Sequence, residues 1–273
     1  TIIVCENSFH GRTMATLTAT GNRKAHAGFE PLVSGFIRAP FGDSETIAEI
    51  CKNNSQVCAI FVEPIQGEGG INIPSETYLQ ELRALCDKHN LLLMLDEVQT
   101  GNGRTGKWFA CHHHNILPDV MTTAKGLGNG MPIGACLARG AAAELFGPGS
   151  HGSTFGGNPL ACATALQVIK TIEEENLLSH AESMGNILVD SLKQTLDDHS
   201  LIKDIRGCGM MIGIELTVPC VSIVDIALEK KLLVNVTANN VIRLLPPLIT
   251  STDEIAIIAN LICECIQDFQ QQL

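Results

Sequence analysis

The chain has 273 residues, of which 45% are hydrophobic and 17% charged, enough to bury a substantial core in one large domain or two smaller ones. Its formal net charge is −11, with acidic residues spread along the whole length, which argues against a nucleic-acid partner because such a partner needs a basic face. No apolar run approaches the ~20 residues that span a bilayer, and no signal peptide is visible, so a membrane partner is not expected.

Cysteine usage predicts a reducing compartment. The eleven cysteines are scattered among aliphatic residues, as in NSQVCAIFVEP and RALCDKHN, and no pair has the C-x-x-C spacing. Cysteine used in this way is a small hydrophobic residue, which is typical of a cytoplasmic protein. The sequence opens on the strand-like run TIIVC without an initiator methionine, so we expect a fragment that was processed or cut.

Short apolar runs alternate with helical patterns in the first half of the chain. The runs apolar enough for strands cover residues 1–5, 57–63, 91–97, 119–124 and 133–138. The middle runs are apolar on both faces, as in a covered parallel sheet. Residues 75–90 predict a helix with Ser75 as N-cap, and the apolar face of this helix consists of Leu79, Leu82, Leu85 and Cys86. Strand, helix and strand in this rhythm predict βαβ crossovers and an α/β layer.

After the motif GGNP, the sequence pattern changes from alternating strands and helices to a long helical pattern. Asn158 and Pro159 suit a helix start, and residues 160–198 read as one long helix or as two helices separated by a break. Further strands are expected at residues 210–216, 232–236 and 241–245, and further helices near 221–231 and 252–271. Ser251 and Glu254 have the spacing of a capping box at the last helix. We therefore expect a large domain over residues 1–169 and a smaller α+β domain over residues 170–273.

Two motifs resemble other kinds of site but lack the context of those sites. GNGRTG, residues 101–106, matches G-x-G-x-x-G and nearly matches a phosphate-binding loop, but both motifs must lead straight into a helix. Trp108 stands where that loop needs Ser or Thr, and no helical stripe follows, so we expect a turn-rich loop. The run HHH, residues 112–114, lacks the i, i+4 histidine pair of zinc sites, so we expect a partly exposed loop and no metal.

The runs that follow the expected parallel strands are ENSFHGRT, EPIQGEGG, DEVQTG and AKGLGNG, and they meet at the edge where open α/β sheets bind ligands. A lysine at this edge, such as Lys125, is expected to be desolvated by apolar neighbours. Its pKa is then lowered, and it can form a Schiff base with a carbonyl such as that of pyridoxal phosphate (PLP). Asp96 ends the buried run LLLML and is placed opposite the PLP ring nitrogen; a helix-cap or loop carboxylate is the alternative.

Longer motifs carry a family resemblance. LLLMLDEVQTGNGRTGKWFA, PDVMTTAKGLGNGMPIGA, FVEPIQGEGG and HGSTFGGNPLACA resemble the class III (subgroup II) PLP-dependent aminotransferases. The match is nearest to the acetylornithine aminotransferases, with ornithine and 4-aminobutyrate aminotransferases as relatives. The resemblance implies the α/β fold of fold-type I PLP-dependent transferases, with a mostly parallel sheet in a large PLP-binding domain, a smaller α+β C-terminal domain and an obligate homodimer.

The resemblance also implies roles around the cofactor ring. Lys125 is similar to the Schiff-base lysine of the family, which moves the proton between Cα and the C4′ atom of the cofactor. Asp96 is expected to hold the pyridinium proton and so to keep the ring an electron sink. Val98 and Phe9 are expected to sandwich the ring, although core packing is the usual role of a phenylalanine such as Phe9. Gln99 is expected to bond the phenolic oxygen of the ring.

Further roles implied by the resemblance concern the phosphate and the substrates. Thr154 is similar to the threonine that reaches the phosphate of the cofactor in the partner subunit, so the active site is shared across the dimer. Arg12 and Arg243 match positions that bind substrate carboxylates, for which a planar guanidinium is suited; a buried structural salt bridge is the alternative for Arg243. Glu68 matches a glutamate that pairs with this arginine while the ω-amino substrate is bound and releases it for 2-oxoglutarate. Glu63 has a supporting role or is a solvated loop acid.

The activity that follows is a ping-pong transfer of an ω-amino group through PLP to 2-oxoglutarate, giving an aldehyde and glutamate. N-acetylornithine is the expected donor, as in arginine biosynthesis, and ornithine, succinylornithine and 4-aminobutyrate are alternatives. Members of the family carry an upstream segment whose turn grips the PLP phosphate, and residue 1 lies after it, so the resemblance implies N-terminal truncation. A catalytically silent fragment or paralogue with a structural role is the alternative from another class.

Overall fold

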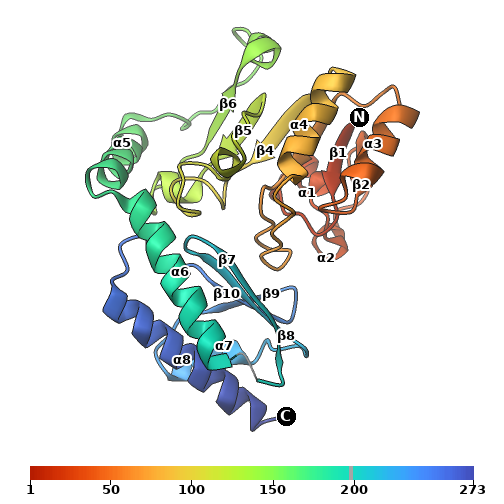
Figure 1. The fold of residues 1–273 in the computed structure, drawn as a ribbon. Coiled ribbons are helices and arrows are strands. Elements are labelled where there is room, and N and C mark those ends of the chain that lie inside the picture. The colour runs from red at the N-terminus through yellow and green to blue at the C-terminus, as the bar shows by residue number, and fades with distance from the viewer. Residues whose placement is uncertain (197–198) are drawn as a thin grey trace. The chain divides into compact units, whose positions relative to one another are not determined.

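The computed structural model describes residues 1–196 and 199–273, which form two compact units (Figure 1). The first unit consists of Thr1–Gly67, Pro74–Asn102 and Phe109–Thr171. The second unit consists of Glu68–Ile73, Gly103–Trp108 and Ile172–Leu273. The chain therefore passes from the first unit into the second more than once, and each unit has a hydrophobic core of its own.

The first unit is built on a six-stranded sheet in the order β2-β1-β3-β4-β5-β6. Its strands are β1 (Ile2–Cys5), β2 (Phe36–Ala39), β3 (Ala59–Val62), β4 (Leu92–Asp96), β5 (Val120–Thr123) and β6 (Ala135–Ala138). All neighbours pair in parallel except β5 and β6, which are antiparallel. Each strand predicted in the first half is confirmed. The edge strand β2 was missed because its run is short and is interrupted by Arg38.

The helical elements of the first unit are mostly short. They are α1 (Met14–Ala19), α2 (Arg23–His26), α3 (Ser44–Asn53), α4 (Tyr78–His89) and the 3-10 helices η1 (Ala110–His114), η2 (Lys125–Leu127) and η3 (Gly140–Glu144). The predicted helix α4 is confirmed, and Leu79, Leu82 and Cys86 on its inner face are fully buried. Ser75 as its N-cap was wrong, because a separate turn joins Ser75 to Tyr78 and Thr77 takes the cap position.

The second unit is built on an antiparallel four-stranded sheet in the order β7-β8-β10-β9. Its strands are β7 (Ile202–Cys208), β8 (Met211–Leu216), β9 (Asn235–Thr237) and β10 (Val241–Leu244), and its helices are α6 (Leu177–Leu196), α7 (Ile223–Glu229) and α8 (Thr252–Gln270). The capping box of Ser251 and Glu254 is confirmed at α8. The strand β7 was missed because charged residues interrupt its apolar pattern.

The helix α5 (Pro159–Glu174) leads from the first unit into the second, and α6 follows it. The break between them is at Asn176, whose φ of 54° lies in the left-handed region that ends a helix. Of the two readings of residues 160–198, the pair of helices is therefore confirmed. The last two residues of that predicted helix, 197–198, lie outside the described residues.

The motif GNGRTG and the histidine run do not form the nucleotide or zinc sites that they resemble. Residues 101–109 form turns and bends, with Gly103 and Gly106 at positive φ, and the residues directly after the motif, 107–109, are bends and not a helix, so the expected turn-rich loop is confirmed. The histidine run lies in the 3-10 helix η1 rather than in a loop. Among the described residues, no cluster of metal-binding side chains comes together, and no helix is long and apolar enough to cross a bilayer. No disulfide joins the cysteines among the described residues.

Candidate active site

The carboxyl ends of four neighbouring parallel strands define the candidate site in the first unit. The strands β1, β3, β4 and β5 lie side by side in this order, so the segments that follow them leave the sheet at one edge. Phe9, Glu63, Asp96 and Lys125 all belong to these segments. The parallel sheet therefore gathers residues that are far apart in the sequence.

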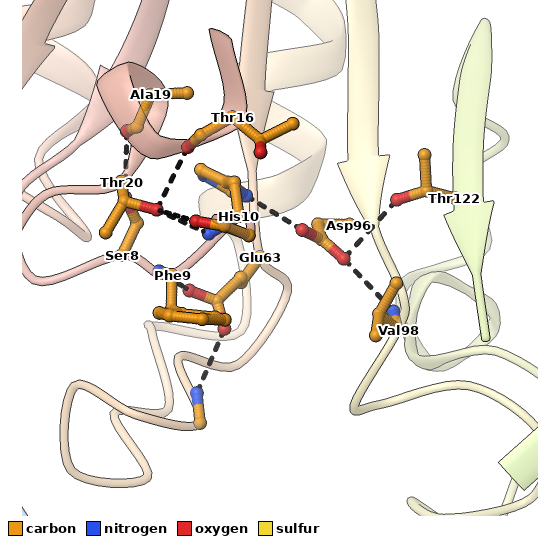
Figure 2. A network of polar contacts seen from close by, with 12 residues as sticks. Ser8, Phe9, His10, Thr16, Ala19, Thr20, Glu63, Asp96, Val98 and Thr122 are labelled. Carbon is orange, nitrogen blue, oxygen red and sulfur yellow. Dashed lines mark hydrogen bonds and ion pairs between the residues drawn. The ribbon is translucent and has the colours of Figure 1, made fainter. Parts of the chain in front are cut away.

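Asp96 is the last residue of β4 and is buried, with 7% of its surface exposed. Its Oδ2 lies 2.8 Å from Nδ1 of His10, and its Oδ1 accepts hydrogen bonds from Val98 N at 3.2 Å and from Thr122 Oγ1 at 3.3 Å (Figure 2). A buried carboxylate is costly unless it is hydrogen-bonded or paired. The three donors meet that requirement and hold the carboxylate in one orientation, so Asp96 is not a helix-cap or solvated loop acid.

His10 is the principal site residue to which the sequence assigned no role. Its ring stacks on Phe61, with centroids 4.1 Å apart, and its backbone N–H donates to Thr20 Oγ1 at 2.9 Å. Because a carboxylate can only accept, Nδ1 of His10 carries the proton that faces Asp96. The sequence offered one indication of this contact: a histidine follows one predicted strand, and an aspartate that must be paired if it is buried ends another.

Glu63 is buried and does not reach solvent, so the reading as a solvated loop acid was wrong. Its two oxygens accept hydrogen bonds from the backbone of Phe9, at 2.8 Å, and of Gly67, at 3.1 Å (Figure 2). Burial raises the pKa of the carboxyl to about 8, against the lowering effect of the two N–H donors. The charge of Asp96 raises this pKa further and the charge of Lys125 lowers it, so both charged groups act on Glu63.

Lys125 follows β5 and begins η2, with φ of 42° in the left-handed region. The expectation that apolar neighbours desolvate it was wrong, because Lys125 is exposed in this chain. The residues that follow are glycine, leucine and glycine, and the two glycines have no side chains with which to cover the lysine.

The remaining predicted ring contacts lie on the same segments. Phe9 is half-buried, and the guanidinium carbon of Arg12 lies 5.7 Å from the centre of its ring. Val98 is held through its backbone by Asp96. Gln99 lies against Gly67 so closely that a Cβ added at Gly67 would come within 2.2 Å of Gln99 Oε1. Their predicted contacts with a cofactor stay predictions.

Thr154 is exposed in the segment that precedes α5. Its expected partner is a phosphate held by a second subunit, so the single chain does not test the prediction. The chain on either side of Thr154 is also exposed: β6 is accessible along its whole length, and the exposed large apolar side chains between β6 and the start of α5 are Leu145, Phe146, Phe155 and Leu160.

Two of the predicted substrate residues come together in the second unit. Arg243 of β10 donates from Nη1 to Oε1 of Glu68 at 2.8 Å, and from Nη2 to Oδ1 of Asn235 at 3.1 Å. The side chain of Arg243 is 11% exposed and that of Glu68 is 43% exposed. The pair is thus accessible from the carboxylate side, which distinguishes it from a fully buried structural salt bridge.

Comparison with known proteins adds to this geometry. A family described as "Aminotransferase class-III" matches residues 1–266. The acetylornithine aminotransferase of Nitrosomonas europaea is 58% identical over 248 residues, which cover 91% of this chain and 63% of that protein. The acetylornithine aminotransferase of Methanothermobacter thermautotrophicus is 46% identical and covers 98% of this chain and 68% of its own length. The chain thus spans less than two thirds of the first relative's length.

Solved structures agree in fold. The ornithine aminotransferase of Toxoplasma gondii has a TM-score of 0.95 at 34% identity, and the match covers 100% of this chain and 66% of that one. A second structure of that enzyme, also with a TM-score of 0.95, has PLP at partial occupancy in its active site. The acetylornithine aminotransferase of Elizabethkingia anophelis has a TM-score of 0.84 at 36% identity, over 98% of this chain and 65% of that one. The fold is that of the fold-type I transferases.

Proposed function

We propose, from the premise that this chain belongs to the class-III aminotransferase family, that it forms part of a PLP-dependent aminotransferase. The proposed reaction moves the ω-amino group of N-acetylornithine to 2-oxoglutarate by a ping-pong mechanism and yields an aldehyde and glutamate. The observation that carries the proposal is the oriented carboxylate of Asp96 at the end of β4, beside the strand β5 that leads to Lys125.

The residues present fit the cofactor. A protonated pyridine nitrogen needs a carboxylate that stays ionised, and Asp96 is supplied with donors on both oxygens. Lys125 brings a primary amine, and its charge lowers the pKa of Glu63, which supports a place for Lys125 near this group of polar residues. The absence of a Cβ at Gly67 leaves space for the side-chain amide of Gln99, which we propose bonds the phenolic oxygen.

PLP supplies, when bound, a carbonyl for the amine and a protonated ring that withdraws electrons from the reacting carbon. Lys125 would hold the carbonyl group through Nζ and would then serve as the base that moves the proton at the carbon bearing the amine. Asp96 would hold the proton on the ring nitrogen, and His10 orients Asp96 through the bond from Nδ1. Phe9 and Val98 would lie against the ring.

Two arginines are proposed to bind the carboxylates of the substrates. We assign Arg12 and Arg243 to this task because a guanidinium binds a carboxylate through two parallel hydrogen bonds. Glu68 occupies Arg243 while an ω-amino donor is bound and is displaced when the dicarboxylate 2-oxoglutarate enters. The ion pair in the structure, with Nη1 and Oε1 2.8 Å apart, supports the first of these two arrangements.

The assembly and setting are part of the same proposal. We propose a cytoplasmic homodimer that acts in arginine biosynthesis. The relatives named acetylornithine aminotransferase support the donor, and the exposed apolar side chains on β6 and α5, which a second subunit would cover, support the homodimer. Thr154 then binds the phosphate in the partner subunit.

The cofactor assignment is tested by borohydride reduction in the presence of PLP. Reduction is expected to fix the cofactor to Nζ of Lys125, as detected in the mass of the peptide that contains it. Lys125→Asn is the appropriate variant, because asparagine tolerates the left-handed conformation at this position. Lys88→Ala, at an exposed lysine of α4, is the control and should retain the mark. If neither variant loses the mark, the assignment of Lys125 is contradicted.

The donor is tested separately, with single-turnover measurements on the PLP-loaded protein as naturally encoded. N-acetylornithine, ornithine, succinylornithine and 4-aminobutyrate are each supplied as the sole donor, and the loss of the visible band of the bound cofactor is followed. N-acetylornithine should react fastest. A faster reaction of another donor would overturn the substrate and keep the aminotransferase, whereas no reaction with any donor would favour a catalytically silent chain.

A further inference from the structure

One row of residues crosses the whole sheet of the second unit. In the strand register, Arg206 of β7 is opposite Gly213 of β8, Gly213 is opposite Arg243 of β10, and Arg243 is opposite Asn235 of β9. Residues opposite one another on neighbouring strands point to the same face of a sheet. The alternate residues of these strands belong to the core beneath the helices and include Ile205, Ile212, Ile242 and Leu244. The row therefore lies on the face away from that core.

The segment Glu68–Ile73 of the second unit lies on this row. Arg243 binds the carboxylate of Glu68, and Arg206 donates from Nη2 to the carbonyl of Gly70 at 2.6 Å and from Nε to the carbonyl of Ile71 at 2.7 Å. Gly213, between the two arginines, has no side chain, and a Cβ added there would come within 2.9 Å of the Cβ of Ile71. Ile71 thus packs directly on the sheet between two arginine contacts.

The guanidinium of Arg206 is itself held in place from the opposite side. Its Nη1 lies 2.7 Å from Asp204 Oδ2 and 2.7 Å from Glu215 Oε2, and the side chain is 18% exposed. Partial burial raises the pKa of Glu215, but the hydrogen bonds from Lys203 and Arg206 outweigh it and lower that pKa below its ordinary value. Glu215 therefore stays ionised and fixes the direction in which Arg206 donates.

The conformation of Ile71 shows that the segment is constrained. Its φ of 52° lies in the left-handed region, which a β-branched residue rarely adopts, and its side chain is fully buried. Such a conformation persists only where the surrounding contacts enforce it, and it is found preferentially at functional sites. Here the enforcing contacts are the two bonds from Arg206, the packing on Gly213 and the bond from Thr237 Oγ1 to the carbonyl of Glu68.

We propose that Arg206 is a positioning residue that holds the segment Glu68–Ile73 so that Glu68 rests on Arg243, and that it thereby sets how readily a substrate carboxylate displaces Glu68. The inference rests on the proposed function, in which Arg243 binds substrate carboxylates. Weakening the hold of Arg206 frees Glu68 to leave Arg243, so the population shifts toward the form that accepts dicarboxylates.

The test uses the PLP-loaded protein as naturally encoded and compares kcat/KM for 2-oxoglutarate with kcat/KM for the ω-amino donor. Arg206→Lys keeps the charge beside Asp204 and Glu215 but cannot reach both carbonyls. Gly213→Ala disturbs Ile71 from the opposite side and leaves Arg206 unchanged. Each variant should raise the ratio in favour of 2-oxoglutarate roughly tenfold, about the effect of one charge-assisted hydrogen bond.

The control is Lys203→Met, which removes the other cation from Glu215, at 2.6 Å, without touching the segment. It should leave the ratio unchanged. The inference would be overturned if both test variants had lower thermal stability but an unchanged ratio. It would also be overturned if Lys203→Met changed the ratio as much as the test variants do. Arg243→Lys separates the two proposals: if it alters the use of 2-oxoglutarate and Arg206→Lys does not, only this inference fails. If Arg243→Lys has no effect on either substrate, the carboxylate-binding role fails and this inference fails with it.

Discussion

Nδ1 of His10 lies 2.8 Å from Oδ2 of Asp96, although the two residues are 86 positions apart in the sequence. They follow β1 and β4, which are not neighbours in the sheet, since β3 lies between them. The His10 ring reaches Asp96 across the end of β3, where it stacks on Phe61. The orientation of Asp96 therefore depends on the packing of three strands.

His10→Leu is expected to weaken PLP binding by about 10- to 100-fold, because it removes a hydrogen bond to a charged group worth roughly 1.5–3 kcal/mol. His10→Asn offers an N–H near the position of Nδ1 and should retain most of the affinity. Titration of the apoprotein with PLP measures both. Equal losses in the two variants would show that the stacked ring, and not the hydrogen bond, is what matters.

Asp96→Asn is expected to lower kcat by about 100- to 1000-fold, because an uncharged amide no longer stabilises the proton on the ring nitrogen, and breaking a buried ion pair costs about 3–5 kcal/mol. Single-turnover rates at saturating PLP give this comparison. Asp119→Asn, at a carboxylate paired with Arg83, is the control and should change stability but not the rate. An unchanged rate in Asp96→Asn would remove Asp96 from the catalytic machinery.

Glu63→Gln is expected to change how stability depends on pH in the chain without cofactor. Because the pKa of Glu63 is raised to about 8 in the folded chain, the folded state holds a proton that the unfolded chain has already released. The free energy of unfolding of the natural chain should then fall as pH rises from the ordinary value of 4.5 toward 8.

This fall amounts to about 5 kcal/mol at most, since one pKa unit corresponds to about 1.4 kcal/mol. Glu63→Gln cannot titrate, so its stability relative to the natural chain should improve as pH rises through this window. Urea denaturation at about pH 5 and about pH 8.5 measures the difference. A constant difference between the two chains would show that Glu63 is ionised throughout.

Gly67→Ala is expected to weaken PLP binding roughly tenfold, because the added Cβ displaces Gln99 from its position and removes about one hydrogen bond. Gly134→Ala is a matched control, since the nearest atom to its added Cβ, Thr123 O, is 3.5 Å away. Cofactor titration should separate the two variants. If both bind PLP as the natural chain does, Gln99 has no part in holding the ring.

Ser251→Ala is expected to destabilise the second unit by about 1 kcal/mol, because it removes the side-chain oxygen that accepts from Glu254 N at the start of α8. Ser222→Ala is the control, because Ser222 occupies the N-cap position of α7 without a side-chain cap bond. Thermal unfolding of both variants provides the measurement. Equal destabilisation would mean that the capping box contributes nothing measurable.

Much of the fold and part of the site could be predicted because the signals are local. The runs around Leu93 and Leu95 are apolar on both faces, which predicts buried parallel strands, and the residues that follow such strands are gathered by the sheet itself. Asp96 could be identified in this way, as could the helical face of α4. The exposure of Lys125 could not be predicted, because it depends on which other segments pack around the residue and not on the local pattern.

The sequence by itself determined most of the elements, although not β2 and β7, and which chemical groups stand at the ends of the predicted strands, since periodicity and strand order along the chain express both. Only the tertiary structure decided which of these groups meet. Arg206 is opposite Gly213 because an irregularity between Ile202 and Asp204 shifts the register of β7, and a shift of one residue would turn its side chain to the other face. Register arises from pairing between strands, and no pattern within one strand contains it.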